Sequence, residues 1–168
     1  MLLLLGGIII AVWALRFFET TQQPAKVKGV HPSFPVFVRL AYVWAIVAAA
    51  LGIWASSVED SHGIWGASRH ALTVGFLATM VFSVGPRILP AFSGMRLLFS
   101  TRLMFLSLLL LGVGCLLRVS SEILAYQGFA GWAWSWLSVS AVIEMTAVTI
   151  FAINLLVTFI SRPPSQPV

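Results

Sequence analysis

Among the ionisable side chains within or beside the apolar segments of this sequence, three have types and positions that could do chemistry, since such residues are costly in lipid and often functional. They are His70, Arg87 and Glu144. A neutral imidazole binds haem iron or copper. A carboxyl in lipid carries a proton or pairs with a cation, and a guanidinium suits a propionate or a phosphate. These residue types therefore point to metal ligation, proton transfer and anion binding.

His70 opens the segment HALTVGFLATM. As a helix, this segment would have two faces of different residue types. Ala71, Gly75 and Thr79 form a stripe of small residues at i, i+4 and i+8, which predicts close packing against another helix. His70 leads a separate face that also carries Met80. His70 is either a ligand of haem iron or copper, with Met80 as a soft axial group, or an interfacial histidine bonded to water or a carbonyl.

Glu144 is expected about 12 Å inside the last apolar segment, at about 1.5 Å per residue. Its helix face is polar or small and should therefore face protein; the other members are Ser140, Ala147, Phe151, Asn154 and Thr158. Arg118, His70 and Arg69 are candidate partners at a similar depth. Glu144 is either a proton relay, support for a metal-bound histidine, or half of a buried pair with Arg118 that holds two helices together.

Arg87 lies in GPRILP, where Pro86 is expected to kink or end a helix and Pro90 to prevent its continuation. Arg87 either extends to the membrane surface or binds a propionate or a phosphate. The sequence contains no phosphate-binding glycine loop, no CxxCH haem attachment, no paired cysteines and no hydrolase elbow. Soluble-enzyme chemistry therefore has no support.

The composition indicates that lipid is the solvent for much of the surface. Of the 168 residues, 60% are hydrophobic and 9% are charged, against about 25% charged in a soluble domain. The mean hydropathy is +0.99. The net charge of +5 does not indicate nucleic-acid binding, because in a membrane protein the position of each cation matters more than the sum.

Five apolar segments predict an all-α integral membrane protein with a single membrane domain over residues 1–168. The expected spans are 1–18, 36–56, 68–89, 102–120 and 136–160, each near the ~20 residues that cross a bilayer. The first segment has no basic residue before it and no clear cleavage site after it. We therefore expect a retained helix rather than a signal peptide.

The basic residues predict the orientation. Eight of the ten flank the first and third connections or follow the last span, which places the N-terminus outside and the C-terminus in the cytoplasm; they are Arg16, Lys26, Lys28, Arg39, Arg87, Arg96, Arg102 and Arg162. Five tryptophans fall at the opposite edge as an aromatic belt; they are Trp54, Trp65, Trp132, Trp134 and Trp136. The expected location is the bacterial inner membrane.

The stretch HALTVGF, followed by TM and then by PRILPAFSG, resembles the NnrS family of membrane proteins linked to the nitric oxide response. Members contain haem and copper, so the resemblance implies a b-type haem or copper site with His70 as a ligand and Arg87 as a motif position. Members are longer and have more spans. By this resemblance the chain looks like part of such a protein, with a site completed by a partner.

The resulting hypothesis is a small membrane subunit that binds haem b, or less readily copper. It would belong to a membrane redox complex, as a non-catalytic subunit of an oxidoreductase, or to a nitric-oxide response. The alternatives are a cofactor-free accessory subunit and a proton-coupled transport component that uses Glu144. The expected partners are other membrane subunits and the lipid bilayer, with no nucleic acid.

Overall fold

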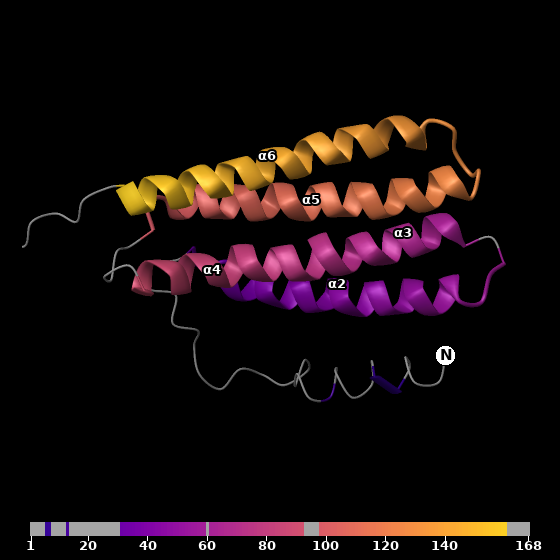
Figure 1. Ribbon diagram of the computed structural model, residues 1–168, viewed down its shortest axis with the longest axis horizontal. Coiled ribbons are helices and arrows are strands. Elements are labelled where there is room, and N and C mark those ends of the chain that lie inside the picture. The colour runs from indigo at the N-terminus through magenta and orange to yellow at the C-terminus, as the bar shows by residue number, and fades with distance from the viewer. Residues whose placement is uncertain (1–5, 8–12, 14–30, 60, 93–97, 161–168) are drawn as a thin grey trace, which may run out of the picture.

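The computed structural model describes residues 31–59, 61–92 and 98–160, together with Gly6, Gly7 and Trp13. Every regular element in this part of the chain is a helix (Figure 1). The elements are α2 (Phe34–Ala55), α3 (His62–His70), the π-helix η1 (Ala71–Ala78), α4 (Thr79–Phe92), α5 (Thr101–Tyr126) and α6 (Ala133–Ile160). The fold is therefore all-α over the described residues, as the sequence predicts.

In the part of the chain that the structure describes, four helices are long and apolar enough to cross a membrane, which fits a multi-pass membrane protein. They are Phe34–Ala55, the continuous helix His62–Ile88 made of α3, η1 and the start of α4, Thr101–Tyr126 and Ala133–Ile160. The predicted span at 1–18 lies outside the described residues except at three positions. The described structure therefore contains four of the five expected spans.

The observed helix boundaries differ from the predicted spans at several points. These differences change where the polar residues lie along the helices. The third span begins at His62 rather than at 68, so His70 lies two turns inside a helix instead of at its head. The fourth span continues to Tyr126 rather than ending near 120. The third span continues through Pro86 and Pro90 to Phe92, so Pro86 does not end the helix and Pro90 does not prevent its continuation, contrary to those expectations. Hydropathy alone missed these extensions, because helical hydrogen bonding continues through polar residues.

The last turn of α5 is closed by a glycine. Gly128 has φ +71°, a left-handed conformation that glycine adopts without strain. Its N–H donates to Ala125 O at 3.2 Å, and the N–H of Phe129 donates to Leu124 O at 3.0 Å. This pair of bonds is the Schellman arrangement that satisfies the last carbonyls of a helix. The glycine therefore sets the end of α5.

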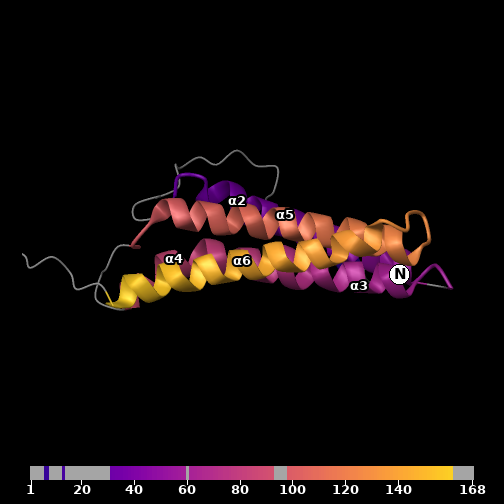
Figure 2. The same cartoon turned by 90° about the horizontal axis from the view of Figure 1, so that it is seen from above.

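The helices run along one axis as a bundle (Figures 1 and 2). α5 packs along α6 and also against α3, while α2 packs against α3 and η1. α6 touches α4 only slightly and rests mainly on α5. Because α5 contacts both α3 and α6, side chains from these three helices can meet.

One face of α6 is buried against α5, as the sequence predicts. Its members are Ser140, Ala147, Phe151, Asn154 and Thr158, none more than 9% exposed. At the far end of this face, Asn154 Nδ2 donates to Ser100 O at 2.8 Å, and the N–H of Phe99 donates to Thr158 Oγ1 at 2.9 Å. The polar residues on this face fix the α4–α5 connection to α6.

The small-residue stripe of the third span also packs as predicted. Ala71, Gly75 and Thr79 are buried, and α2 lies against η1. A Cβ added to Gly75 would lie 2.6 Å from Trp44 Cγ and 2.8 Å from Trp44 Cβ. The Trp44 side chain therefore packs in the space that a side chain at position 75 would occupy.

We expect Gly75→Ala to destabilise the bundle by about 1–3 kcal/mol, the usual cost of overpacking. The clashing atoms lie at the root of the Trp44 side chain, so a rotamer change cannot easily relieve the clash. Gly112→Ala is the control, because the nearest atom to its added Cβ is Leu40 Cδ2 at 3.9 Å. Thermal unfolding in detergent measures both variants. Equal stability of the two would contradict the observed packing.

Candidate functional site

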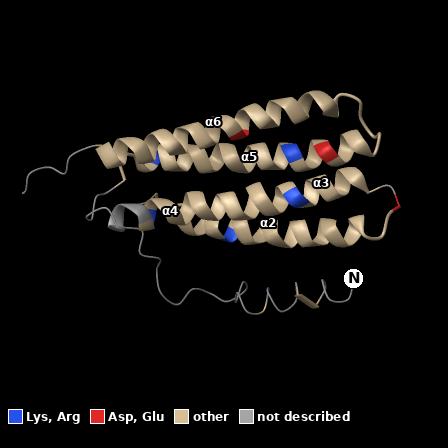
Figure 3. Cartoon of the chain, viewed as in Figure 1, with Lys and Arg blue, Asp and Glu red and all other residues tan. Residues whose placement is uncertain are grey.

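Four ionisable residues gather between α3, α5 and α6, and we call them the polar cluster: His70, Arg118, Glu122 and Glu144. Figure 3 shows acidic and basic residues on these helices between the middle of the bundle and the end that carries the α2–α3 and α5–α6 connections. We call this end the tryptophan end, because Trp54, Trp65, Trp132, Trp134 and Trp136 lie there with exposed side chains. The cluster lies within the span-length helices.

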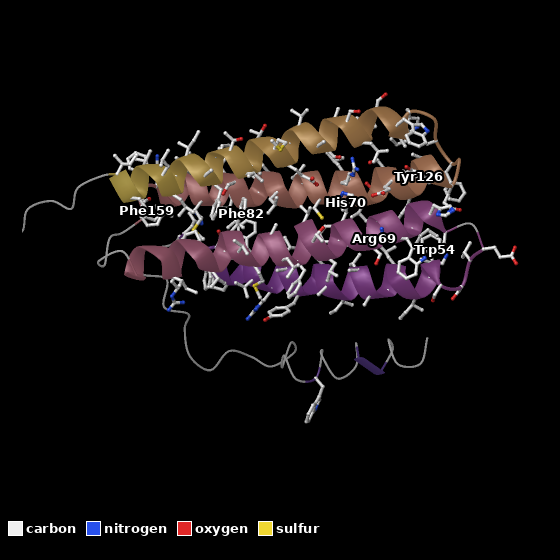
Figure 4. All side chains as sticks on the ribbon, in the orientation of Figure 1. Trp54, Arg69, His70, Phe82, Tyr126 and Phe159 are labelled. Carbon is white, nitrogen blue, oxygen red and sulfur yellow. The ribbon has the colours of Figure 1, made fainter. Side chains whose placement is uncertain are left out.

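His70 points back along its own helix toward α5 (Figure 4). Its Nδ1 lies 3.1 Å from Gly66 O and 3.2 Å from Glu122 Oε2. A proton on Nδ1 can thus be donated to the carbonyl and shared with the carboxylate. Nε2 makes no hydrogen bond to any described residue, and the side chain is 31% exposed. One ring nitrogen is therefore anchored and the other is available.

Glu122 is held between α3 and α5. Its side chain is only 10% exposed, and Oε2 lies 3.9 Å from Arg118 Nε, one turn earlier on α5. The carboxyl rests on Gly66 so closely that any Cβ at position 66 would collide with Oε1. Arg118 also reaches α6, where Nη1 donates to Leu137 O at 3.3 Å. The Arg118–Glu122 pair therefore links three helices.

Glu144 enters the polar cluster from α6. Its Cγ lies against Gly114 of α5, where an added Cβ would come within 2.7 Å. Its Oε1 is buried without a hydrogen-bond partner. His70 and Arg118 are the charged groups within electrostatic range. The structure thus brings Glu144 close to two of its three expected partners but bonds it to neither, while Arg69 is exposed.

Met80 and Arg87 lie away from the polar cluster. Met80 follows His70 by ten residues on one continuous helix, roughly 15 Å along its axis. Arg87 is exposed near the other end, with its guanidinium carbon 5.8 Å from the centre of the Phe34 ring. The described structure therefore does not bring either residue to His70.

The other two histidines also lie elsewhere. His62 starts α3 and is exposed, about 12 Å from His70 along the helix axis. His31 precedes α2, where its Nδ1 lies 2.6 Å from Ser33 Oγ and its ring packs on Phe105 at 4.7 Å between centroids. No group of three or more His, Cys, Asp or Glu within the described ranges could hold a metal ion. Neither His31 nor His62 lies where it could join His70 in one metal site.

Glu122 is the member of the polar cluster that the sequence analysis missed, because it was assigned to the fourth connection. A signal was present in the sequence. Gly114, Arg118, Glu122 and Tyr126 follow one another at intervals of four, which places them on one helix face. Reading Gly128 as the helix stop would have extended the span through Glu122.

The His70 geometry suits metal ligation. A metal-bound histidine usually donates its second N–H to a carbonyl or a carboxylate, which fixes the ring and raises its basicity. Gly66 O and Glu122 Oε2 are acceptors of these two kinds. A haem needs only one such nitrogen from this chain, whereas a copper site would need several ligands. His70 could therefore supply one nitrogen to a haem, with Gly66 O and Glu122 orienting its ring.

Comparisons with known proteins found a match to one family model and no match to an individual protein. Neither the curated proteins nor the solved structures contain a match to this chain. A family model described as "Domain of unknown function (DUF8744)" matches residues 2–159, which include all members of the polar cluster. Since the match covers nearly the whole sequence, the chain belongs to the DUF8744 family.

Proposed function

We propose that this protein is an integral-membrane subunit of a redox complex, in which His70 Nε2 is an axial ligand of a haem. The observation that carries the proposal is the anchored imidazole: Nδ1 faces Gly66 O and Glu122 Oε2, while Nε2 has no hydrogen-bond partner among the described residues. The resemblance of the segment around His70 to haem-containing NnrS proteins supports the same ligand. Bound haem would supply one-electron transfer.

The chain's own residues orient and tune the ligand in this proposal. Gly66 O and Glu122 fix the tautomer of His70, with the proton on Nδ1. Arg118 lies 3.9 Å from Glu122 Oε2 and offsets its charge. The second ligand would come from another subunit, because His31 and His62 lie away from the polar cluster. Copper in place of haem would require several ligands from partners.

An absorption difference spectrum tests this proposal directly. Reduced-minus-oxidised spectra of the protein purified from its own membranes, with its partners retained, should show a b-type haem. Pyridine extraction should then identify the same haem chemically. A preparation with neither signal would reject haem binding.

A cofactor-free accessory subunit is the second candidate, favoured by the exposed face of α6. This face holds a shallow depression lined by Ala141, Val142, Met145, Thr146, Thr149 and Ile150. Its small residues and threonines suit close packing of another membrane helix. The two candidates share a partner subunit and differ in the haem spectrum.

We further propose five spans in a bacterial inner membrane, with the tryptophan end outside and the C-terminus in the cytoplasm. The positions of the basic residues support this orientation. A cysteine placed at the exposed Ser57 should react with a membrane-impermeant maleimide in intact cells, and a tag at Val168 should not be accessible. Background labelling should be low because the native Cys115 is fully buried. The reverse labelling pattern would reject the orientation.

A further inference from the structure

Three buried polar atoms in the polar cluster make no well-formed hydrogen bond. Arg118 Nε and Glu122 Oε2 face each other as an ion pair at 3.9 Å, whereas Glu144 Oε1 has neither a hydrogen bond nor an ion-pair contact. These three are the only such side-chain atoms among the described residues. A buried polar atom without a partner costs about 1–3 kcal/mol. Their concentration between α3, α5 and α6 indicates a place for water rather than three separate defects, because internal water binds where several polar groups converge.

A polar line connects this place to the tryptophan end. Gly114, Arg118, Glu122 and Tyr126 share one face of α5, and Tyr126 is 52% exposed. Glu144 lies against Gly114, at the inner end of the line. The line from Tyr126 to Gly114 covers roughly 18 Å of helix. Water could therefore reach Glu144 along α5 from one surface of the bundle.

The opposite direction is closed by apolar packing. Phe151 lies seven residues beyond Glu144 on the same face of α6 and stacks on Phe82, with 3.9 Å between ring centroids. Both rings belong to a buried apolar cluster that includes Leu108 and Leu111. These residues offer water no polar contact. Glu144 therefore lies at the inner end of a route that opens to one side.

Burial without a bonded partner favours a bound proton on Glu144, against the opposing effect of the nearby cationic Arg118. From α5 the ionisable groups facing it are Cys115, Arg118 and, further out, Glu122; from α3 there is His70. α6 has no other ionisable residue, and Arg87 of α4 lies near the far end. Arg118 already faces Glu122 and Leu137 O. An ionised carboxylate without a bonded partner is expensive in lipid.

We propose that Glu144 is a proton-binding site, reached by water from the tryptophan end along Arg118 and Glu122. In the exchange step the O–H bond of the Glu144 carboxylic acid breaks and its proton passes to water. The remaining carboxylate faces Arg118, and a proton from bulk water later re-forms the acid. The carboxyl oxygens of Glu122 accept hydrogen bonds from the water. No electron moves, and the site needs no ligand on His70.

Infrared spectroscopy of the protein in lipid nanodiscs tests the bound proton. The wild type should show a carboxylic-acid C=O band at neutral pH that shifts in D₂O. Glu144→Gln should lose the band, whereas Glu59→Gln, which changes an exposed carboxyl in the α2–α3 connection, should keep it. A band that survives in Glu144→Gln, or is absent from the wild type, would overturn the proposal. Neither result depends on haem absorption.

The rate of deuterium exchange at this band tests the route. Ser140 is fully buried one turn before Glu144. Replacing its hydroxyl by the methyl groups of valine should narrow the water route. Ser140→Val should therefore slow deuterium exchange at the Glu144 band about tenfold or more, as expected when a proton-transfer contact is lost. Ser83→Val is the matched control. Both hydroxyls are buried and donate to a carbonyl of their own helix at 2.7 Å, but Ser83 neighbours Phe82 beyond the apolar closure. Equal rates in the two variants would overturn the route.

Discussion

His70→Ala is expected to abolish the b-type haem spectrum while leaving the helices inserted. Removing the imidazole removes His70 Nε2, which has no hydrogen-bond partner among the described residues and lies on a ring that Gly66 O and Glu122 orient. Membrane insertion depends on the apolar segments and not on one polar side chain. Haem content per protein and the yield in the membrane fraction are the two measurements.

His62→Ala is the matched control for this experiment. It removes an imidazole from the same helix run, but His62 is exposed at the start of α3. This variant should keep full haem content. His70→Met should keep weaker binding with a changed potential, because the axial ligand sets the potential. Haem retained at wild-type level in His70→Ala would show that His70 is an interfacial hydrogen-bonding residue.

Glu122→Leu is expected to lower the free energy of unfolding by about 3 kcal/mol, since breaking a buried ion pair leaves the other charge uncompensated. Leucine would leave Arg118 Nε and His70 Nδ1 without the carboxylate that both face. In Glu122→Gln the side chain still fills the space beside Gly66 and keeps one acceptor oxygen. This variant should therefore lose clearly less free energy of unfolding than Glu122→Leu. Thermal unfolding in detergent compares the variants.

The same pair of variants separates stability from ligand orientation. Glu122→Gln should still weaken metal binding at His70 by on the order of 10–100-fold, the usual effect of losing a residue that orients a ligand. Glu59→Leu is the control, because Glu59 is exposed in the α2–α3 connection and should change stability by less than about 0.5 kcal/mol. If Glu122→Leu is as stable as this control, the Arg118–Glu122 contact does not hold the helices together.

The apolar segments alone determined that this protein is helical and suited to a membrane. Local periodicity also identified the buried faces of two helices. The small residues Ala71, Gly75 and Thr79 pack inward, and the face of α6 that carries Glu144 lies against α5. These features are readable because burial of a helix face depends on residue types repeated every three or four positions.

The tertiary structure decided which polar residues meet. Glu122 lies 52 positions after His70, and nothing local to either residue specifies their 3.2 Å contact. That contact exists because α5 continues to Tyr126 and packs against α3 where Gly66 leaves room for a carboxyl. Met80 was a candidate for the same site by face and residue type, but it lies ten residues further along the same continuous helix, away from His70. Side-chain contacts between helices depend on the end of each helix and on close approach of backbones, which hydropathy does not encode.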